Sequence, residues 1–491
     1  MEAKGIVLLG LGPGQANLIT REAWDWLGKI DQLYLRTTYH PAVAELPGTI
    51  SRHSFDAVYE TGESFESVYE EIIATVLDLG KRPEGVTYAV PGHPFVTEET
   101  CPEIYRRAKK LGIPVRVIEG LSFIEPTFRA LELDPFPQVT LVDALKLARM
   151  QTPSFPPSQP ALIAQIYSRE VASDVKLTLM SVFPDEHLVQ LIHAAGTDEE
   201  RIEHLPLYAI DQSAHLGLLS SLYIPALENG SAFEDFQEII ARLRAPGGCP
   251  WDREQTHISL KPFLLEETYE ALEALDLEDM QLLKEELGDI LLQVVLHAQI
   301  AEEDGDFNMS DVLQAISDKM QRRHPHVFSD GTAKDVDGVI QKWEEIKADE
   351  RKDNHHAEKK GMLDGIPLNL PALVQAQHIQ ERARRIGFDW PEISGVLKKV
   401  EEELLELNQA QNEQERRAEA GDLLFAVVNL ARWLDVEAES ALRESNRRFK
   451  KRFAFIEQSA EELGKALNDL TFEEMDALWE QAKLKFKSDP V

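Results

Sequence analysis

Pairs of acidic side chains recur at a helical spacing in the C-terminal half of the chain. Each pair lies three residues apart, so one helix carries both members on the same face. The pairs are Glu267 with Glu270, Glu286 with Asp289, Glu403 with Glu406, and Glu419 with Asp422. Two antiparallel helices with such pairs can bring four carboxylates together, and these repel one another unless a cation lies between them. Because oxygen ligands favour Mg²⁺ or Mn²⁺ over Zn²⁺, the pairs predict a divalent-metal site.

The spacing by itself is weak evidence, because an acidic chain contains such pairs by chance and a solvated helix face explains most of them. Asp289 and Asp422 are more informative. Each opens a run that is apolar around most of the helix, so we expect both to be buried. A buried ionised carboxylate is costly unless it is paired or bound to a metal. The alternative is that each Asp caps a helix start, but the residues before it already have a helical pattern.

Basic and aromatic side chains follow each acidic set. Two basic pairs, each four residues apart, could hold phosphate oxygens that a metal does not neutralise. These are Lys319 with Arg323, and Arg448 with Arg452. Two further pairs could stack on a base and hold a phosphate: Trp343 with Lys347, and Trp479 with Lys483. The alternatives are a basic patch that balances an acidic protein, and core Trp residues beside exposed Lys residues.

These residues are positioned by an internal repeat. The segment GDILLQVVLHA (288–298) matches GDLLFAVVNLA (421–431), and each is preceded by an acidic helix and followed by a basic one. We therefore expect two all-helical units, residues 233–347 and 372–488, joined by a polar linker. The carboxylates do not distinguish the two units, because both units carry the full set.

The two units differ in their basic segments. The second has a dense basic run at 448–452, whereas in the first Pro325 ends the helix soon after Arg323. A broken helix places fewer cations at a triphosphate. We therefore predict that the second unit is the more active site, and that the first serves mainly in folding or dimer contacts.

The first 224 residues have a different character, with short apolar runs that alternate with helical patterns. This alternation predicts an α/β module, and the Pro-rich stretch 152–160 predicts a division into two subdomains. Predicted strands include 6–12, 86–92, 115–120, 162–167 and 205–211. Glycine-rich turns follow three of them, beginning with Gly10, Gly12 and Gly14, and such turns at strand ends suggest a ligand crevice.

Composition excludes several classes of protein. With 51 basic and 86 acidic residues the net charge is −35, which disfavours a duplex nucleic-acid binder and a protein of anionic membrane surfaces. No apolar run approaches the length of a membrane span. The chain has two cysteines, Cys101 and Cys249, so a disulfide framework is excluded and a reducing cytoplasm is expected.

The segment from Gly247 to Lys483 resembles the MazG family of nucleotide pyrophosphohydrolases. The matching motifs are GGCPWDREQT (247–256), RRHPHVF (322–328), GFDW (387–390) and the acidic pairs. The resemblance implies hydrolysis of nucleoside or deoxynucleoside triphosphates to the monophosphate and pyrophosphate, in a homodimer formed through the helical half. It assigns the acidic pairs as metal ligands, and Arg448, Arg452, Trp479 and Lys483 as nucleotide-contacting residues.

The chemistry of such a site follows from its groups. A metal ion lowers the pKa of a bound water, and Glu266 or Glu402, beside the acidic pairs, could take the proton. Basic side chains would stabilise the departing pyrophosphate. The sequence leaves open whether water attacks the α- or the β-phosphorus. An alternative function for the helical half is that of an interaction scaffold with ordinary acidic faces. The duplicated Gly-Asp apolar helices are evidence against this alternative.

The N-terminal segment, about residues 4–222, resembles the tetrapyrrole (corrin/porphyrin) methylases, which bind S-adenosylmethionine between two α/β subdomains. The motifs are GLGPG with Leu18 and Thr20, PGHP (91–94) and EGLS (119–122). The resemblance implies an S-adenosylmethionine site lined by the glycine turns, with residues Gly12, Pro13, Gly14, Gly92, His93 and Ser122. The family commonly has Asp at the position of His93, which puts methyl transfer in doubt. An alternative is therefore a binding or regulatory module that has lost catalysis, and the methyl acceptor stays open.

Overall fold

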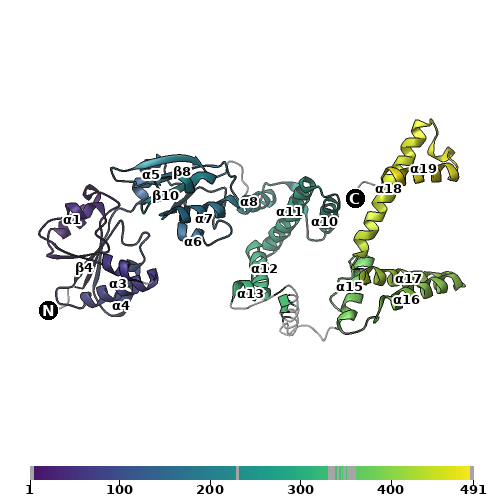
Figure 1. The fold of residues 1–491 in the computed structure, drawn as a ribbon, viewed down its shortest axis with the longest axis horizontal. Coiled ribbons are helices and arrows are strands. Elements are labelled where there is room, and N and C mark those ends of the chain that lie inside the picture. The colour runs from purple at the N-terminus through teal and green to yellow at the C-terminus, as the bar shows by residue number, and fades with distance from the viewer. Residues whose placement is uncertain are drawn as a thin grey trace. The chain divides into compact units, whose positions relative to one another are not determined.

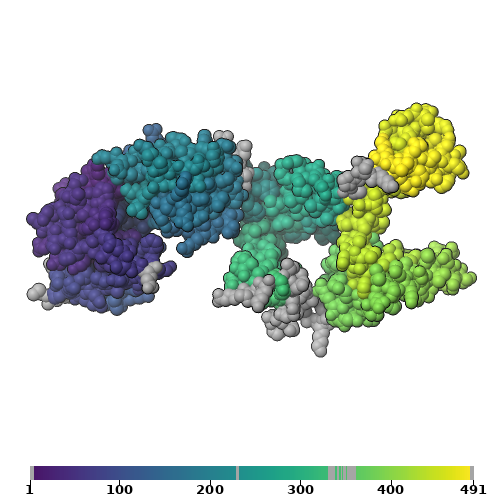
Figure 2. All heavy atoms as spheres, in the orientation of Figure 1, coloured from purple at the N-terminus to yellow at the C-terminus, as the bar shows by residue number. Residues whose placement is uncertain are grey.

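The structure is a computed structural model that describes residues 5–62, 64–227, 232–329 and 361–486, with residues 335, 338, 339, 342, 343, 346 and 350. The chain divides into two compact units, Met1–Leu243 and Arg244–Val491 (Figure 1, Figure 2). The first holds two β-sheets with helices, and the second is helical throughout its described residues. The predicted fold class, an α/β module with two subdomains followed by helical units, is confirmed.

The first sheet is parallel and has the strand order β3-β2-β4-β1-β5. Its strands are β1 (Ile6–Gly10), β2 (Gln32–Leu35), β3 (Ser51–Ser54), β4 (Val86–Val90) and β5 (Val115–Ile118). The helices of this subdomain are η1 (Ala16–Leu18), α1 (Arg21–Leu27), η2 (Pro41–Glu45), α2 (Asp56–Thr61), α3 (Phe65–Gly80) and α4 (Thr100–Lys110). Strands β1 and β4 are buried along their whole length, as expected for continuous apolar runs in a parallel sheet. Because β1 lies between β4 and β5, the turns that follow these three strands are neighbours.

The second sheet is mixed, with the order β6-β7-β10-β8-β9; β6 is parallel to β7 and the other pairs are antiparallel. Its strands are β6 (Thr140–Asp143), β7 (Ala161–Ala164), β8 (Leu188–His193), β9 (Arg201–Pro206) and β10 (Ser220–Ile224). Its helices are α5 (Ile124–Leu131), α6 (Ala144–Leu147), α7 (Arg169–Met180) and η3 (Leu207–Gln212). The predicted strand at 205–211 is mostly wrong, because residues from Leu207 form η3. Leu207 and Ile210 are both buried, and their three-residue spacing suits one face of a 3₁₀ helix.

The helical half is built from two helix hairpins and the helices around them. The helices up to the linker are α8 (Phe233–Arg244), α9 (Pro250–Glu254), α10 (Lys261–Asp276), α11 (Met280–Asp304), α12 (Met309–Arg323) and α13 (Pro325–Phe328). Those after it are α15 (Ala372–Arg385), α16 (Ile393–Gln409), α17 (Glu413–Trp433), α18 (Ala438–Glu462), η4 (Leu467–Asp469) and α19 (Phe472–Lys485). Helix α10 packs on α11, and α16 packs on α17 in the same way. Helix α12 ends at Arg323, two residues before Pro325, as the sequence predicted. In the described part of the chain, every helix is too short or too polar to cross a membrane.

The two hairpins leave apolar side chains uncovered. The exposed fraction is 53% for Leu287 on α11, 58% for Leu405 on α16 and 60% for Leu424 on α17. Single exposed leucines are ordinary, but here they lie on the paired helices of both hairpins. The hairpins therefore present more apolar surface than one chain covers.

Candidate metal and ligand sites

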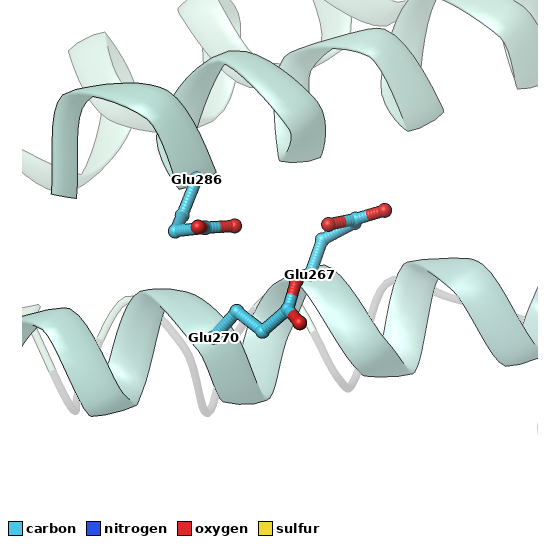
Figure 3. Close-up of side chains that lie close together, drawn as sticks. All are labelled: Glu267, Glu270 and Glu286. Atoms are coloured by element: carbon cyan, nitrogen blue, oxygen red, sulfur yellow. The ribbon is translucent and has the colours of Figure 1, made fainter. Parts of the chain in front are cut away.

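Three carboxylates converge between α10 and α11. Glu267 and Glu270 project from one turn of α10, and Glu286 projects from α11 toward them (Figure 3). One oxygen of each lies within 4.8 Å of the others, and we call this group the first acidic cluster. Glu286 is 7% exposed, whereas Glu270 is exposed to solvent. The predicted i, i+3 pair on α10 therefore does meet a residue of the next helix.

The carboxylates of the first acidic cluster destabilise one another's charge. Desolvation, together with the negative charges of Asp289 and Glu270, raises the pKa of Glu267. Desolvation and the charges of Glu270 and Asp289 raise the pKa of Glu286 as well. Asp289 thus acts on the cluster, although its oxygens lie outside the closest group. A set of oxygen donors with unfavourable mutual repulsion fits a hard divalent cation such as Mg²⁺ or Mn²⁺.

A second acidic cluster lies between the corresponding helices, α16 and α17, but here the first helix contributes one carboxylate and the second contributes two. It contains Glu403, Glu419 and Asp422, again with one oxygen of each within 4.8 Å of the others. Glu403 is 5% exposed. Desolvation and the charges of Glu406 and Asp422 raise the pKa of Glu419, so Glu406 lies near without joining the closest group. The donor set fits the same class of cation.

A lysine distinguishes the second cluster from the first. The Lys399 Nζ atom lies 2.7 Å from Glu403 Oε1 and 2.8 Å from Glu402 Oε1. These hydrogen bonds raise the pKa of Lys399. An ammonium group therefore already compensates part of the negative charge of this cluster. The sequence analysis missed this contact, although the i, i+4 spacing of Lys399 and Glu403 signals it.

The expectation that Asp289 and Asp422 are both buried is wrong. Asp289 is half-buried and Asp422 is exposed. Both lie well inside α11 and α17, so neither caps a helix start. Their exposure follows from the uncovered faces of the hairpins, because the apolar residues beside them are also only partly buried within one chain.

The two candidate proton acceptors lie beside the clusters and not within them. Glu266 is exposed on α10, and Glu402 is exposed on α16, where it accepts a hydrogen bond from Lys399. Their assignment as general bases stays a prediction.

In the first helical unit, the arginines at the end of α12 are held by a carboxylate. Arg322 Nε and Arg323 Nη2 each lie 2.7 Å from an oxygen of Glu350. These bonds lower the pKa of Glu350 to about 2. The Arg323 guanidinium also lies over the Trp343 ring, 5.8 Å from its centre. Lys319 is exposed on α12, and Lys347 lies outside the described residues.

In the second unit, the predicted nucleotide-contacting residues gather on α18 and α19. The Arg452 guanidinium lies over the Trp479 ring at 5.5 Å, and Phe449 lies 4.9 Å from the same ring. Arg448 pairs with Glu444 at 2.6 Å, and Lys483 pairs with Glu480 at 2.5 Å. Within the part of the chain that the structure describes, no ion pair joins these basic groups to the second acidic cluster.

In the N-terminal module, the three glycine turns meet at the carboxyl ends of β1, β4 and β5. Gly12 and Gly92 exchange two backbone hydrogen bonds, of 3.2 and 2.7 Å. A Cβ atom on Gly10 would lie 2.6 Å from the Gly92 carbonyl oxygen, and one on Gly120 only 2.4 Å from it. Side chains at these positions would force the strands apart, so glycine is required for the turns to converge.

The predicted cofactor residues divide into two kinds. Pro13 and Gly14 are buried, and a Cβ on Gly14 would lie 2.6 Å from the carbonyl oxygen of Gly196 in the second subdomain. His93 is half-buried, and its Nδ1 accepts a hydrogen bond of 3.0 Å from the backbone of Phe95. Ser122 is buried, but its hydroxyl donates to Glu125 and accepts from the backbone of Ile124, so it fixes the start of α5. The glycines and His93 therefore belong to the converging turns, whereas Ser122 already has local partners.

Sequence reasoning also missed His40, which precedes η2. Its side chain is buried at 7% exposure, and its pKa is lowered by that burial. A single histidine in a loop gives no pattern from which its position beside the glycine turns could be inferred.

Comparisons with known proteins agree with this division of the chain. A model of the "MazG nucleotide pyrophosphohydrolase domain" matches residues 255–328, and one of the "Tetrapyrrole (Corrin/Porphyrin) Methylases" matches residues 5–211. The chain is 43% identical over 487 residues to the "Uncharacterized protein YabN" of Bacillus subtilis, which covers 97% of this chain and 98% of that protein. It is 47% identical over 256 residues to the "Nucleoside triphosphate pyrophosphohydrolase/pyrophosphatase MazG" of Thermotoga maritima, covering 52% of this chain and 97% of that one. The "Nucleoside triphosphate pyrophosphohydrolase" of Escherichia coli is also 47% identical, over 253 residues that make up 50% of this chain and 94% of that protein.

Proposed function

The chain belongs to the family of fusion proteins that join a tetrapyrrole methylase domain to a MazG pyrophosphohydrolase region, and from this premise we propose that its helical half is a divalent-metal-dependent nucleoside triphosphate pyrophosphohydrolase. The reaction cleaves a nucleoside or deoxynucleoside triphosphate with water into the monophosphate and pyrophosphate. The observation that carries this proposal is the pair of acidic clusters, each with three carboxylates within 4.8 Å.

Different groups of residues would have different roles in this reaction. The clustered carboxylates, with Asp289 and Glu406 beside them, would hold Mg²⁺ or Mn²⁺, which when bound withdraws charge from a triphosphate and acidifies water. Glu266 or Glu402 would take the proton of the attacking water. The basic residues Lys319, Arg323, Lys347, Arg448, Arg452 and Lys483 would hold phosphate oxygens, and Trp343 and Trp479 would stack on the base.

The test is pyrophosphate release from a panel of NTPs and dNTPs with the full chain, in Mg²⁺ and in excess chelator. We expect release in Mg²⁺ only, and loss of it in the double variant Glu286→Gln/Glu419→Gln. Glu302→Gln, an exposed change on α11, is the matched control and should leave release intact. A folded wild-type chain that releases no pyrophosphate with any substrate would favour the scaffold reading and overturn the proposal.

We further propose that the active form is a homodimer through the helical half. The exposed leucines on α10, α11, α16 and α17 support it, because paired hairpins would cover them. Within the described residues of one chain, the basic residues of α18 also form no ion pairs with the second acidic cluster. A dimer could bring such groups of two chains together. Light scattering should therefore give twice the chain mass, and Leu405→Glu/Leu424→Glu should give monomers that turn over poorly. A monomeric wild-type chain with full activity would contradict the dimer.

For the N-terminal module we propose S-adenosylmethionine binding at the glycine turns, with methyl transfer to an acceptor of unknown identity. The close convergence of Gly10, Gly92 and Gly120 supports the ligand crevice. His93, where the family commonly has Asp, favours the alternative of a binding or regulatory module. Calorimetry with S-adenosylmethionine tests binding, and transfer of a labelled methyl group to tetrapyrroles and other acceptors separates the two alternatives. We propose that both halves act in a reducing cytoplasm, which suits two free cysteines.

A further inference from the structure

His40 ends a short segment, residues 36–40, that leaves β2 at the carboxyl edge of the first sheet. The segment is held by its backbone and by Thr38. The Arg36 amide donates to the Ala89 carbonyl at 2.9 Å, and the Thr38 amide and hydroxyl donate to Asp56 Oδ2 at 2.9 and 2.6 Å. The His40 carbonyl accepts from the Val43 amide at 3.0 Å. The fold therefore holds the backbone on both sides of the His40 side chain.

The His40 ring is buried without hydrogen-bond partners. The residue is 7% exposed, and among the residues that the structure describes neither Nδ1 nor Nε2 has a partner in hydrogen-bonding geometry. Buried polar groups in native proteins nearly always have a partner, because leaving one unpaired costs free energy. An imidazole with two unpaired nitrogens on an anchored backbone segment indicates that something else completes its hydrogen bonds.

His40 lies close to the first of the glycine turns. The backbone of Gly12 lies close enough to act on the imidazole, although not in hydrogen-bonding geometry. Helix η2, which begins directly after His40, packs on η1, which follows the turn at Gly12. Beside Gly92 there is room, because a Cβ built there would have its nearest neighbour at 4.0 Å, in contrast to the tight packing at Gly10 and Gly120. His40 therefore lies beside the turn at Gly12, which is one of the three turns that meet at the ends of β1, β4 and β5.

We propose that His40 is a ligand-contacting residue of this crevice, where its neutral imidazole donates one hydrogen bond to bound S-adenosylmethionine and accepts another from it. This inference rests on the proposed binding of S-adenosylmethionine. The ligand offers both hydrogen-bond donors and acceptors in its ribose, its adenine and its amino-acid part. Its sulfonium is positively charged, so a neutral ring is the compatible form, and burial of His40 favours that form. A buried water that completes the ring's hydrogen bonds is the competing explanation.

The test is calorimetric titration of the full chain with S-adenosylmethionine. His40→Leu should weaken binding about 10- to 100-fold, because it removes one donor and one acceptor. His40→Gln and His40→Asn each keep an amide that can replace one nitrogen, and one of them should recover part of the affinity. His53→Asn, an exposed histidine on β3, is the matched control and should bind like the wild type. Pyrophosphate release and the thermal midpoint would show that each variant is folded.

A second measurement uses the wild-type chain and so does not depend on the folding of a variant. In ¹⁵N–¹H spectra of the histidine rings, saturating S-adenosylmethionine should shift one imidazole signal that is missing from His40→Gln. Unchanged affinity in folded His40→Leu, or histidine spectra that do not respond to bound ligand, would overturn the role of His40 and leave S-adenosylmethionine binding intact. A wild-type chain that does not bind S-adenosylmethionine would overturn the proposed function of the module and this inference with it.

Discussion

The two acidic clusters draw on the same four positions of the repeat, but they differ in which three carboxylates lie closest and in the charges beside them. In the second cluster, Lys399 contacts Glu403 from one helical turn away. The equivalent position in the first cluster, four residues before Glu267, is Phe263. The first cluster has no lysine at that position, and desolvation together with repulsion between the carboxylates raises the pKa of both Glu267 and Glu286. Duplication has kept the candidate ligands while their electrostatic surroundings diverged.

The basic segments diverge in a corresponding way. In the first unit Arg322 and Arg323 both bind Glu350, and α12 ends at once. In the second unit α18 continues past Arg452 to Glu462, and Arg448 pairs with Glu444, with 39% and 41% of the two side chains exposed. Partly exposed i, i+4 pairs are worth little and break readily. The basic residues of the second unit are therefore the more available for a polyanionic substrate.

The largest expected effect is a difference in turnover between two double variants. Glu403→Ala/Asp422→Ala should lower pyrophosphate release roughly 100-fold or more, because it removes two candidate metal ligands from the unit with available cations. Glu267→Ala/Asp289→Ala should lower it only a few-fold. Both are assayed at the same Mg²⁺ and substrate concentrations.

Thermal unfolding of both double variants is the control for this comparison, since a loss of fold would mimic a loss of site. If the change in the first cluster abolishes turnover and the change in the second spares it, the active unit is the first, and the argument from available cations is wrong.

The next effect concerns pH. A carboxyl whose pKa is raised by folding stabilises the metal-free protein below about pH 4.5, and this contribution is lost as the pH rises through the raised value. A cation that binds the charged form reverses the loss. Mg²⁺ should therefore raise the thermal midpoint by a few degrees at pH 7.5 and by less at pH 5. The dependence should be steeper when only the first cluster remains, because the Lys399 ammonium already compensates part of the negative charge of the second cluster. Equal Mg²⁺ shifts at both pH values would contradict this account.

The smallest expected effect comes from changing the residues that distinguish the two clusters, Lys399 and Phe263. Lys399→Met should tighten Mg²⁺ binding at the second cluster about 2- to 5-fold, because the Lys399 ammonium is partly exposed and its pair with the buried Glu403 contributes on the order of 1 kcal/mol. Phe263→Lys should weaken binding at the first cluster by a similar factor. Calorimetric titration with Mg²⁺ measures both, and Lys398→Met on the solvent side of α16 serves as the control. Weaker binding in Lys399→Met would mean that the lysine orients Glu403 and does not compete with the cation.

Local periodicity predicted more of this molecule than did any inference about its surroundings. The i, i+3 spacing on α10 placed Glu267 and Glu270 together, and Pro325 marked the end of α12, because both depend on a single helix. The burial of Asp422 was mispredicted, because burial depends on what covers the helix and not on the helix itself. His40 gave no signal in the sequence, since its position beside Gly12 arises from the packing of η2 on η1, which are separate in the sequence.

The junction of glycine turns also offers a genetic tool. A methyl group at Gly120 would meet the Gly92 carbonyl oxygen at 2.4 Å, and no rotamer change can relieve a clash with backbone atoms. Gly120→Ala should thus distort the N-terminal crevice without touching a residue of the helical half, which is a separate compact unit. Together with Glu403→Ala/Asp422→Ala, it would give a pair of separation-of-function alleles of one gene. Each allele would inactivate a different half of the protein. Cells that carry both alleles would reveal by complementation whether the two halves must be joined in the same polypeptide.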